Sequence, residues 1–257
     1  MEIIIISLVA LIASMLTFFS GFGLGTILTP VLIIFFPVEV AIALTGIVHL
    51  LNNLFKIGLV GKQIVWRVAF KFGATSVVGA FAGAKLLLYL STHMVLYSYV
   101  LHDKLVEVTV IKLIVSILMI VFALFEVIPA LKKIQLQENK LYVGGIITGF
   151  FGGLSGNQGA LRSMFLLRCG LGKENFIATG IFIACLVDVT RLSVYFTRLS
   201  NIPIQDNLVV LTSAVVSAFA GAYIGSKLLK KITLGFVQYT VTIMVILLAI
   251  GLGTGLL

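Results

Sequence analysis

Long runs of apolar residues are the strongest constraint on how this chain folds. An α-helix needs about 20 residues to cross the hydrocarbon core of a bilayer. Runs of roughly that length are Val38–Val60, Arg67–Leu90, Val106–Ile128, Glu174–Phe196, Asn207–Leu229 and Leu234–Leu256. Charged residues make up only 11% of the sequence, whereas a soluble domain carries about 25%. The alternating polarity that a membrane barrel needs is absent, so the sequence predicts an all-α polytopic membrane protein.

Short motifs that recur at nearly constant spacing indicate an internal duplication. The sequence AFAGA occurs at 80–84 and 218–222, Ser-Gly at 20–21 and 155–156, and Thr-Gly-Ile at 45–47 and 179–181. We therefore expect a first repeat over residues 1–135 and a second over residues 136–257, within one transmembrane domain. Because small residues four apart let helices approach closely, we interpret AFAGA as a packing motif.

Each repeat begins with a glycine-rich stretch that is broken near its middle. After Gly25, only Thr26–Phe36 precedes Pro37, and as a helix this segment would reach about 16 Å, roughly half of the hydrocarbon core. We interpret both stretches as re-entrant helical hairpins buried within the protein, with a fully spanning first hairpin as the alternative because Ile3–Ser20 is long. Either kind of hairpin returns to its starting face, and three crossings follow. The two repeats would then have inverted topology, an arrangement found in transporters.

The distribution of basic residues predicts the orientation in the membrane. The positive-inside rule assigns the face rich in lysine and arginine to the cytoplasm, so we expect a multi-pass protein of the cytoplasmic membrane with both termini outside. The net charge of +9 then reflects topology, and no nucleic-acid partner is expected. The residues on the cytoplasmic face would be Lys62, Arg67, Lys71, Lys132, Lys133, Lys140, Lys173, Lys227, Lys230 and Lys231.

Polar residues within the apolar runs predict a site for an anion. The hairpin tips would expose helix N-termini at Thr26 and Ala160, and such ends favour negative charge. Arg162 follows the second tip, and its planar guanidinium suits the oxygens of a sulfonate, phosphate or carboxylate. Tight turns and bonds within a helix are the structural alternatives for the glycines and threonines. The candidate substrate-binding residues are Gly21, Gly23, Gly25, Thr26, Thr45, Asn52, Asn53, Gly156, Asn157, Gln158, Gly159, Arg162 and Thr179.

Three further residues are candidates for ion coupling. Asp188 and Arg191 lie three positions apart and so share a helix face, where they could form an ion pair. His49 and Asp188 are the intramembrane groups that we nominate for proton coupling. We expect no metal and no cofactor. The sequence lacks a Walker-type phosphate loop, so nucleotide hydrolysis through that motif is not expected. Its two cysteines lie in apolar runs, so a disulfide is not expected either.

The duplicated motifs resemble the TauE/SafE-type transporters, which are permeases of the four-toluene sulfonate uptake type. The matching segments are SGFGLGTILTP with Pro30, ALTGIVHLLNN and VVGAFAGAKLL, and in the second half LSGNQGALRSM, IATGIFIACLVD and VVSAFAGAYIGSKLL. The resemblance implies a secondary transporter, not an enzyme, that moves sulfite, sulfoacetate or another organosulfonate by alternating access. Neither hairpin keeps the glycine triplet of the family, so the motifs do not select one anion.

Two other functions are compatible with the sequence. An anion channel could use the same site, and counterflow or concentrative uptake would distinguish a transporter from it. An intramembrane serine protease could use Ser155, which stands in a Gly-x-Ser-Gly pattern, with His49 as its base. An inverted duplication would have no purpose in such a protease. The direction of transport, the coupling ion and the oligomeric state have no signature in the sequence.

Overall fold

The computed structural model describes residues 2–20, 23–91, 94–101, 104–128, 140–199, 207–228 and 234–257. The glycine-rich stretches form α1 and α2 in the first half and α7 and α8 in the second, and longer helices follow each pair. In chain order the helices are α1 (Glu2–Ser20), α2 (Gly25–Ile33), α3 (Val38–Val60), α4 (Trp66–Leu90), α5 (Val110–Val127), α7 (Leu141–Ser155), α8 (Gly159–Leu166), α9 (Lys173–Leu199), α10 (Leu208–Leu228) and α11 (Leu234–Gly253), with short 3₁₀ turns at Gly61–Gln63 and Leu167–Cys169.

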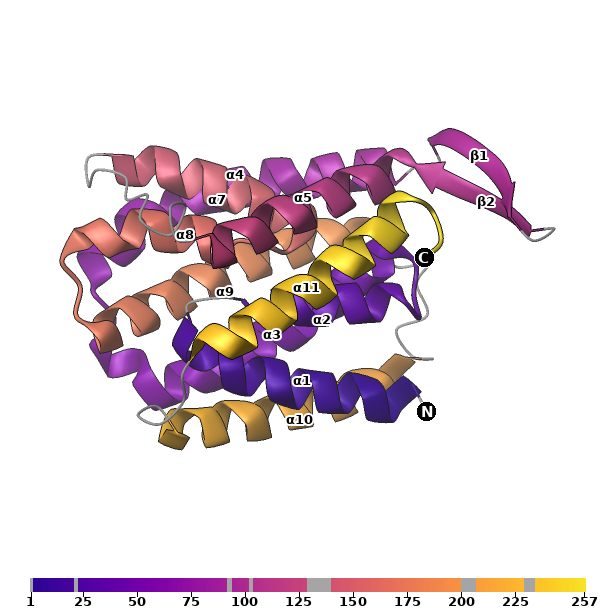
Figure 1. The fold of residues 1–257 in the computed structure, drawn as a ribbon. Helices are drawn as coiled ribbons and strands as arrows, with labels where there is room; N and C mark the ends of the chain where they lie inside the picture. Colours follow the sequence, from indigo (N-terminus) through magenta and orange to yellow (C-terminus); the bar gives the residue numbers. More distant parts are fainter. Residues whose placement is uncertain are drawn as a thin grey trace.

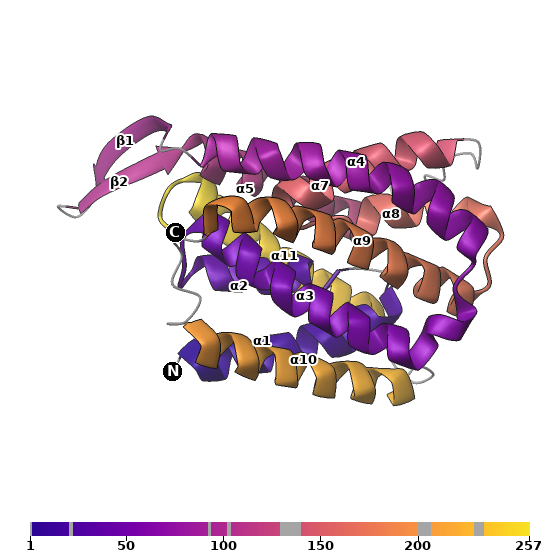
Figure 2. The ribbon, with the colours of Figure 1, turned by 180° about the vertical axis from the view of Figure 1, so that it is seen from behind.

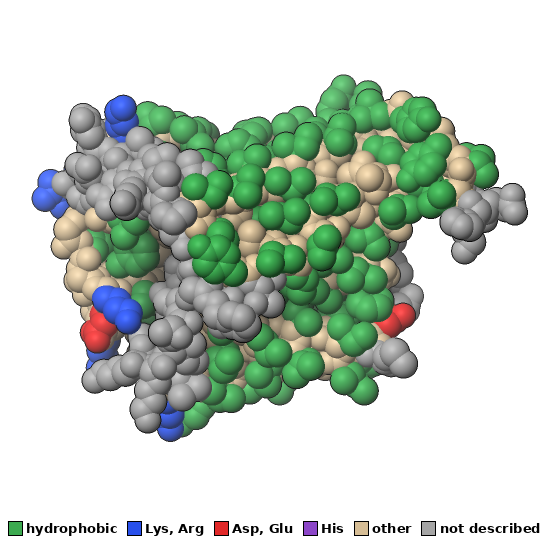
Figure 3. Space-filling model, viewed as in Figure 1, with side chains coloured by type: hydrophobic (Ala, Val, Ile, Leu, Met, Phe, Trp, Pro, Cys, Tyr) green, Lys and Arg blue, Asp and Glu red, His purple; other side chains and the backbone are tan. Residues whose placement is uncertain are grey.

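The helices lie side by side along one common direction, and both termini lie at the same end (Figure 1). Among the described residues, four helices are long and apolar enough to cross a membrane, namely α3, α4, α9 and α10. The helices α1, α5, α7 and α11 contain shorter apolar stretches. Hydrophobic side chains cover most of the face shown in Figure 3, whereas lysine and arginine gather at the end opposite the termini. The chain is thus a mostly helical, multi-pass membrane protein.

A β-hairpin corrects the expectation of an all-α fold. Residues Val95–Leu101 form β1 and Lys104–Thr109 form β2, paired antiparallel and extending beyond one end of the helices (Figure 1). The helix expected from Val106 therefore begins only at Val110, where the Thr109 hydroxyl accepts a hydrogen bond from the Lys112 N–H at 3.3 Å. Valine, tyrosine and threonine favour strands, and hydropathy alone does not distinguish an apolar strand from the start of a helix.

The AFAGA motifs lie where helices from the two halves approach most closely. On α4, a Cβ added at Gly83 would lie 2.0 Å from the carbonyl oxygen of Phe150 on α7. On α10, a Cβ added at Gly221 would lie 2.1 Å from the carbonyl oxygen of Leu11 on α1. At both places backbone meets backbone with no side chain between them. The predicted packing role of the motif is confirmed.

The central helices α3 and α9 pack against each other, and each also packs against a helix of the opposite half (Figure 2). α3 contacts α10, and α9 contacts α4. α5 pairs with α11, and the short helix α2 packs on α3 and α11. Because α3 and α9 are enclosed in this way, polar residues on their facing sides are shielded from both lipid and water.

Candidate functional site

Four polar side chains of α3 point into the protein from one face of the helix. His49, Asn52, Asn53 and Lys56 follow one another at intervals of three, one and three residues, so they form a stripe along the helix. All four are buried, and only 3% of Lys56 is exposed. Polar groups shielded to this degree require partners within the protein or from a ligand. The stripe is therefore the starting point of the site.

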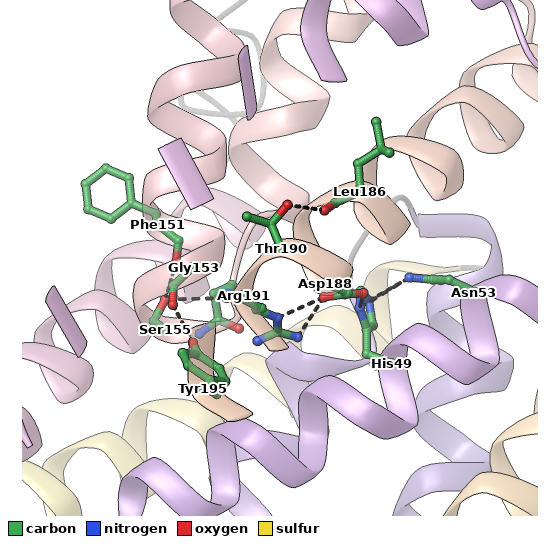
Figure 4. A network of polar contacts seen from close by, with 11 residues as sticks. His49, Asn53, Phe151, Gly153, Ser155, Leu186, Asp188, Thr190, Arg191 and Tyr195 are labelled. Carbon is green, nitrogen blue, oxygen red and sulfur yellow. Dashed lines mark hydrogen bonds and ion pairs between the residues drawn. The ribbon is translucent and has the colours of Figure 1, made fainter. Parts of the chain in front are cut away.

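A buried ionic network joins this stripe to α9 (Figure 4). The Asp188 carboxylate lies 2.6 Å from His49 Nδ1 through one oxygen, and its other oxygen accepts a hydrogen bond from Arg191 Nε at 2.9 Å. Arg191 Nη2 lies 2.8 Å from the same oxygen, and Asn53 Nδ2 lies 3.2 Å from His49 Nδ1. The predicted pairing of Asp188 with Arg191 is confirmed. The contact with His49 connects the two halves of the chain.

The Arg191 side chain is enclosed by two glycines that leave space for its guanidinium. A Cβ added at Gly46 on α3 would lie 3.3 Å from Arg191 Cζ, and one added at Gly156 would lie 2.7 Å from Nη1. Gly156 ends α7 with a φ of 79°, a left-handed conformation that glycine adopts without strain. One turn further along α9, the Tyr195 hydroxyl donates a hydrogen bond to the Gly153 carbonyl. These contacts hold α9 against the break in the second hairpin.

The breaks of the two hairpins lie next to each other. α2 begins at Gly25 and α8 begins at Gly159, and neither helix start is capped by a side-chain hydrogen bond. A Cβ added at Gly25 would lie 3.2 Å from the Gly156 carbonyl oxygen. The expectation that breaks from the two halves converge agrees with this contact.

Several buried polar atoms surround the converging breaks. Within the described part of the chain, no hydrogen-bond partner is found for the hydroxyls of Thr29 and Thr45, the side-chain oxygen of Asn157, or the amide group of Gln158. Buried polar atoms in proteins are usually satisfied by protein, water or ligand. These atoms therefore supply hydrogen-bonding capacity around the two breaks.

A cavity of about 30 Å³ lies between α1, α3, α8 and α9, with room for about two water molecules. Its polar lining consists of Thr17, His49, Asn53, Lys56 and Arg162, and the rest of its wall is apolar apart from Gly180. Arg162 is only 6% exposed. A Cβ added at Gly180 would lie 3.2 Å from Arg162 Nε, so this glycine leaves space for the guanidinium.

The ammonium group of Lys56 lies 5.5 Å from the centre of the Phe18 ring. Lys56 also contacts Asn52. The side-chain amide of Asn52 is oriented so that both its nitrogen and its oxygen have hydrogen-bond partners. Asn52 then donates to the carbonyl of Ala218, and its oxygen lies 3.3 Å from Lys56 Nζ. Within the described residues, no acidic side chain lies within ion-pair distance of Lys56. Lys56 was missed from sequence because it stands near the helix end, where lysine usually extends to the interface.

Of the predicted substrate-binding residues, Asn53 and Arg162 line the cavity, together with His49 from the coupling set. Gly23 leaves space for the His49 ring, because a Cβ added there would lie 3.3 Å from Nε2. Thr179 has a different role, since its hydroxyl accepts a hydrogen bond from the Val65 N–H at 3.0 Å. Thr45 and Asn52 lie on α3 outside the cavity lining, and the other described candidates lie at the breaks between α1 and α2 or between α7 and α8, namely Gly25, Thr26, Gly156, Asn157, Gln158 and Gly159. Gly21 lies outside the described residues.

Ser155 and His49, the pair that an intramembrane serine protease would use, bind different partners. The Ser155 hydroxyl donates to the Phe151 carbonyl of its own helix at 3.0 Å. His49 instead contacts Asp188 and Asn53. The geometry therefore gives no support to a serine–histidine pair at this position.

The fold and the site together define a polytopic membrane protein with a buried, cationic cavity between its central helices. The sequence matches the family model described as "Sulfite exporter TauE/SafE" over residues 6–252, nearly the whole chain, and the protein belongs to this family. The resemblance noted in the duplicated motifs is thereby confirmed. Membership in a family of transporters agrees with a function other than catalysis. Comparison with curated proteins and with solved structures gives no significant match.

Proposed function

We propose that the protein is a secondary transporter of a small sulfur-containing anion, and that the anion binds in the cavity lined by Arg162. The observation that carries this proposal is a buried guanidinium in the wall of a cavity between the two halves of the chain. A charged side chain inside a membrane protein is costly and usually marks a functional site. An oxyanion offers several acceptors to the five donors of arginine.

The size and walls of the cavity favour a compact anion. About 30 Å³ is enough for a group of a few atoms, whereas sulfoacetate or a longer organosulfonate would require the walls to move. Apolar side chains of α9, including Ile177 and Ile181, form part of the wall. They reduce the competition of water for the charged groups and so strengthen the attraction for an anion.

We further propose that residues 1–135 and 136–257 are inverted repeats that alternate access to the site. The helix contacts support this, because α1–α5 and α7–α11 follow the same order and their contacts exchange when the halves are exchanged. α4 packs on α7 as α10 packs on α1, and α9 packs on α4 as α3 packs on α10. The cavity draws its lining from both halves, so movement of one half against the other would open it to alternate sides.

For the orientation we propose a cytoplasmic location of the end that carries most lysine and arginine. In Figure 3 this end lies opposite the termini, which both lie at the other end in Figure 1. The positive-inside rule then puts both termini outside the cytoplasmic membrane. Accessibility of a cysteine introduced at Thr254, at the end that carries the C-terminus, to an impermeant thiol reagent in intact cells tests this orientation.

Transport by the purified protein in liposomes tests the proposed function. Labelled sulfite should accumulate transiently in vesicles preloaded with unlabelled sulfite, because counterflow requires a carrier and a channel does not produce it. Arg162→Ala should abolish this uptake while the thermal unfolding of the protein stays close to that of the wild type. Arg67→Ala, which removes an exposed arginine at the start of α4, is the matched control and should transport normally. Undiminished uptake by Arg162→Ala would refute the assignment of the site.

A further inference from the structure

We propose that His49 binds a proton together with the transported anion, so that the anion enters the cavity fully deprotonated and the proton is carried on Nε2 of the imidazole. This inference rests on the proposed transport function and assigns a second bound ion to the same site. It depends on three features of His49: its carboxylate partner, the surroundings of its second ring nitrogen, and its place between the two halves of the chain.

One edge of the His49 ring is held by Asp188 (Figure 4). Nδ1 lies 2.6 Å from one oxygen of the carboxylate, and the other oxygen accepts a hydrogen bond from Arg191 Nε. An ionised carboxylate only accepts hydrogen bonds, so the hydrogen of this contact is carried by Nδ1. The atom of the neutral ring that can take up a proton from solution is therefore Nε2. The carboxylate would attract the positive charge that this proton brings.

The surroundings of Nε2 suit the neutral ring better than the protonated one. The side-chain nitrogen of Asn53 lies 3.2 Å from Nδ1 and 3.4 Å from Nε2. Because Nδ1 carries a hydrogen, Nε2 is the ring nitrogen that can accept from this amide. A proton on Nε2 removes that acceptor, and both groups then need an oxygen to donate to. His49 and Asn53 line the same cavity, so an anion bound there would provide the oxygens.

The charges around His49 make its protonation depend on the anion. The charged or titratable side chains that contact His49 or surround the same cavity are Asp188, Cys185 and Arg191 of α9, Arg162 of α8 and Lys56 of α3. The lining residues from the first hairpin are uncharged. Asp188 favours the imidazolium, whereas each basic side chain opposes it to the extent that it is charged. A bound anion shifts this balance toward the imidazolium, and by linkage the proton strengthens anion binding to the same degree.

Lys56 is the alternative carrier of such a proton. Among the residues that the structure describes, no acidic side chain lies within ion-pair distance of Lys56. Its ammonium group contacts the ring of Phe18 and the amide of Asn52 instead. His49 has a carboxylate at 2.6 Å. A positive charge is therefore better stabilised on the imidazole, and the inference assigns the proton to His49.

The position of His49 also connects the proton to the contact between the two halves. His49 belongs to α3 and Asp188 to α9, and protonation adds the attraction of opposite charges to their hydrogen bond. The proton would therefore bind more tightly to the state in which these two helices are in contact. Such a difference in affinity is what a ligand needs in order to shift a conformational equilibrium. The proton and the anion would thus favour the same state of the protein.

Inhibition of sulfite counterflow by methanesulfonate tests the inference on the purified full-length protein in liposomes. Methanesulfonate stays a monoanion from pH 6 to pH 8, so it cannot bring a proton of its own. The pH is equal on both sides, and the inhibition constant is derived at each pH from the half-saturation by sulfite measured at that pH. In the wild type this constant should rise by about tenfold or more between pH 6 and pH 8, because one linked proton allows at most about tenfold per pH unit.

Two results with the wild type alone would overturn the inference. The first is an inhibition constant that is the same at pH 6 and at pH 8. The second is sulfite counterflow that methanesulfonate does not inhibit at any pH, because the anion would then have to bring its own proton into the site.

Three variants assign the proton to its residue. His49→Gln should give an inhibition constant that changes by less than about twofold between pH 6 and pH 8. Lys56→Gln should keep the wild-type dependence on pH, whatever its affinity at a single pH. Arg67→Ala, the exposed control, should match the wild type throughout. A folded His49→Gln that keeps the pH dependence, or a Lys56→Gln that loses it, would place the proton elsewhere.

A further variant perturbs Nε2 and leaves the histidine in place. In Gly23→Ala the new Cβ would lie 3.3 Å from Nε2 and would crowd the side of the ring that donates to the anion. This variant decides the question if His49→Gln does not fold. It should raise the inhibition constant at pH 6 more than at pH 8 and so flatten the pH dependence. The full wild-type dependence in Gly23→Ala would refute the role of Nε2.

Failure of this inference is distinguishable from failure of the proposed function. If the wild type shows sulfite counterflow that Arg162→Ala abolishes, but inhibition by methanesulfonate does not depend on pH, the anion site stands and the role of His49 is refuted. If the wild type shows no sulfite counterflow, the proposed function is refuted and this inference is refuted with it.

Discussion

The close glycine contacts between the two halves give a stability prediction that the geometry makes quantitative. In Gly79→Ala the new Cβ would lie 2.1 Å from the carbonyl oxygen of Ile146, and in Gly221→Ala 2.1 Å from that of Leu11. Carbon and carbonyl oxygen normally approach to about 3.3 Å, so each helix pair would have to separate by about 1 Å. A helix carbonyl cannot rotate away as a side chain can. We expect overpacking to cost about 1–3 kcal/mol, which for a chain of this length lowers the melting temperature by about 2–12 °C.

Thermal unfolding of the purified variants in one detergent measures this effect, with Gly58→Ala as the control. Gly58 lies on α3, and no atom lies within 4 Å of a Cβ added there. Alanine is the better helix former by about 1 kcal/mol, so the control should melt at or slightly above the wild-type temperature. If Gly79→Ala and Gly221→Ala unfold at the same temperature as Gly58→Ala, the helices are not in backbone contact and the packing argument is wrong.

Three further variants examine the buried network and the cavity. Asp188→Asn leaves Arg191 without its counter-charge and should lower the free energy of unfolding by about 3–5 kcal/mol; a near-neutral change in denaturant unfolding would show that water reaches the pair. Tyr195→Phe removes one hydrogen bond to a carbonyl of α7 and should cost about 1 kcal/mol by the same measurement, and no loss would mean that the bond does not form. Gly180→Ala displaces Arg162, whose flexible side chain can move, so sulfite affinity should fall while the melting temperature holds; the opposite pattern would assign Gly180 a packing role.

Most helices were predictable because their ends are marked in the sequence. The helix predicted over Val38–Val60 has the same bounds in the structure, since Pro37 precedes its first turn and Gly61 follows its last. The short helix α2 follows a glycine-rich break, as expected. The β-hairpin was not predictable in this way. Its first strand, Val95–Leu101, is as apolar as the end of a membrane helix. Only the strand propensity of its valines and tyrosines indicated a strand.

The candidate site was predictable where partners are close in sequence. Asp188 and Arg191 share a helix face, and spacing alone identified their pairing. The contact of His49 with Asp188 joins residues 139 positions apart, and no local pattern encodes such a contact. Lys56 continues the stripe that begins at His49, so helical spacing contained the signal. We did not use this signal, because a lysine close to the end of a membrane helix is normally interpreted as an interfacial residue.

The Thr-Gly-Ile motif that occurs in both halves has a similar structural consequence at its two positions. In both halves its glycine leaves space for a guanidinium, Gly46 for Arg191 and Gly180 for Arg162. The surroundings of the two guanidinium groups differ. Asp188 neutralises Arg191 and connects α9 to α3, which stabilises the centre of the protein. Arg162 lies instead on a cavity wall that it shares with a lysine. The same tripeptide therefore provides space for a guanidinium in each half, and Asp188 gives the first of these guanidinium groups a structural role between α9 and α3.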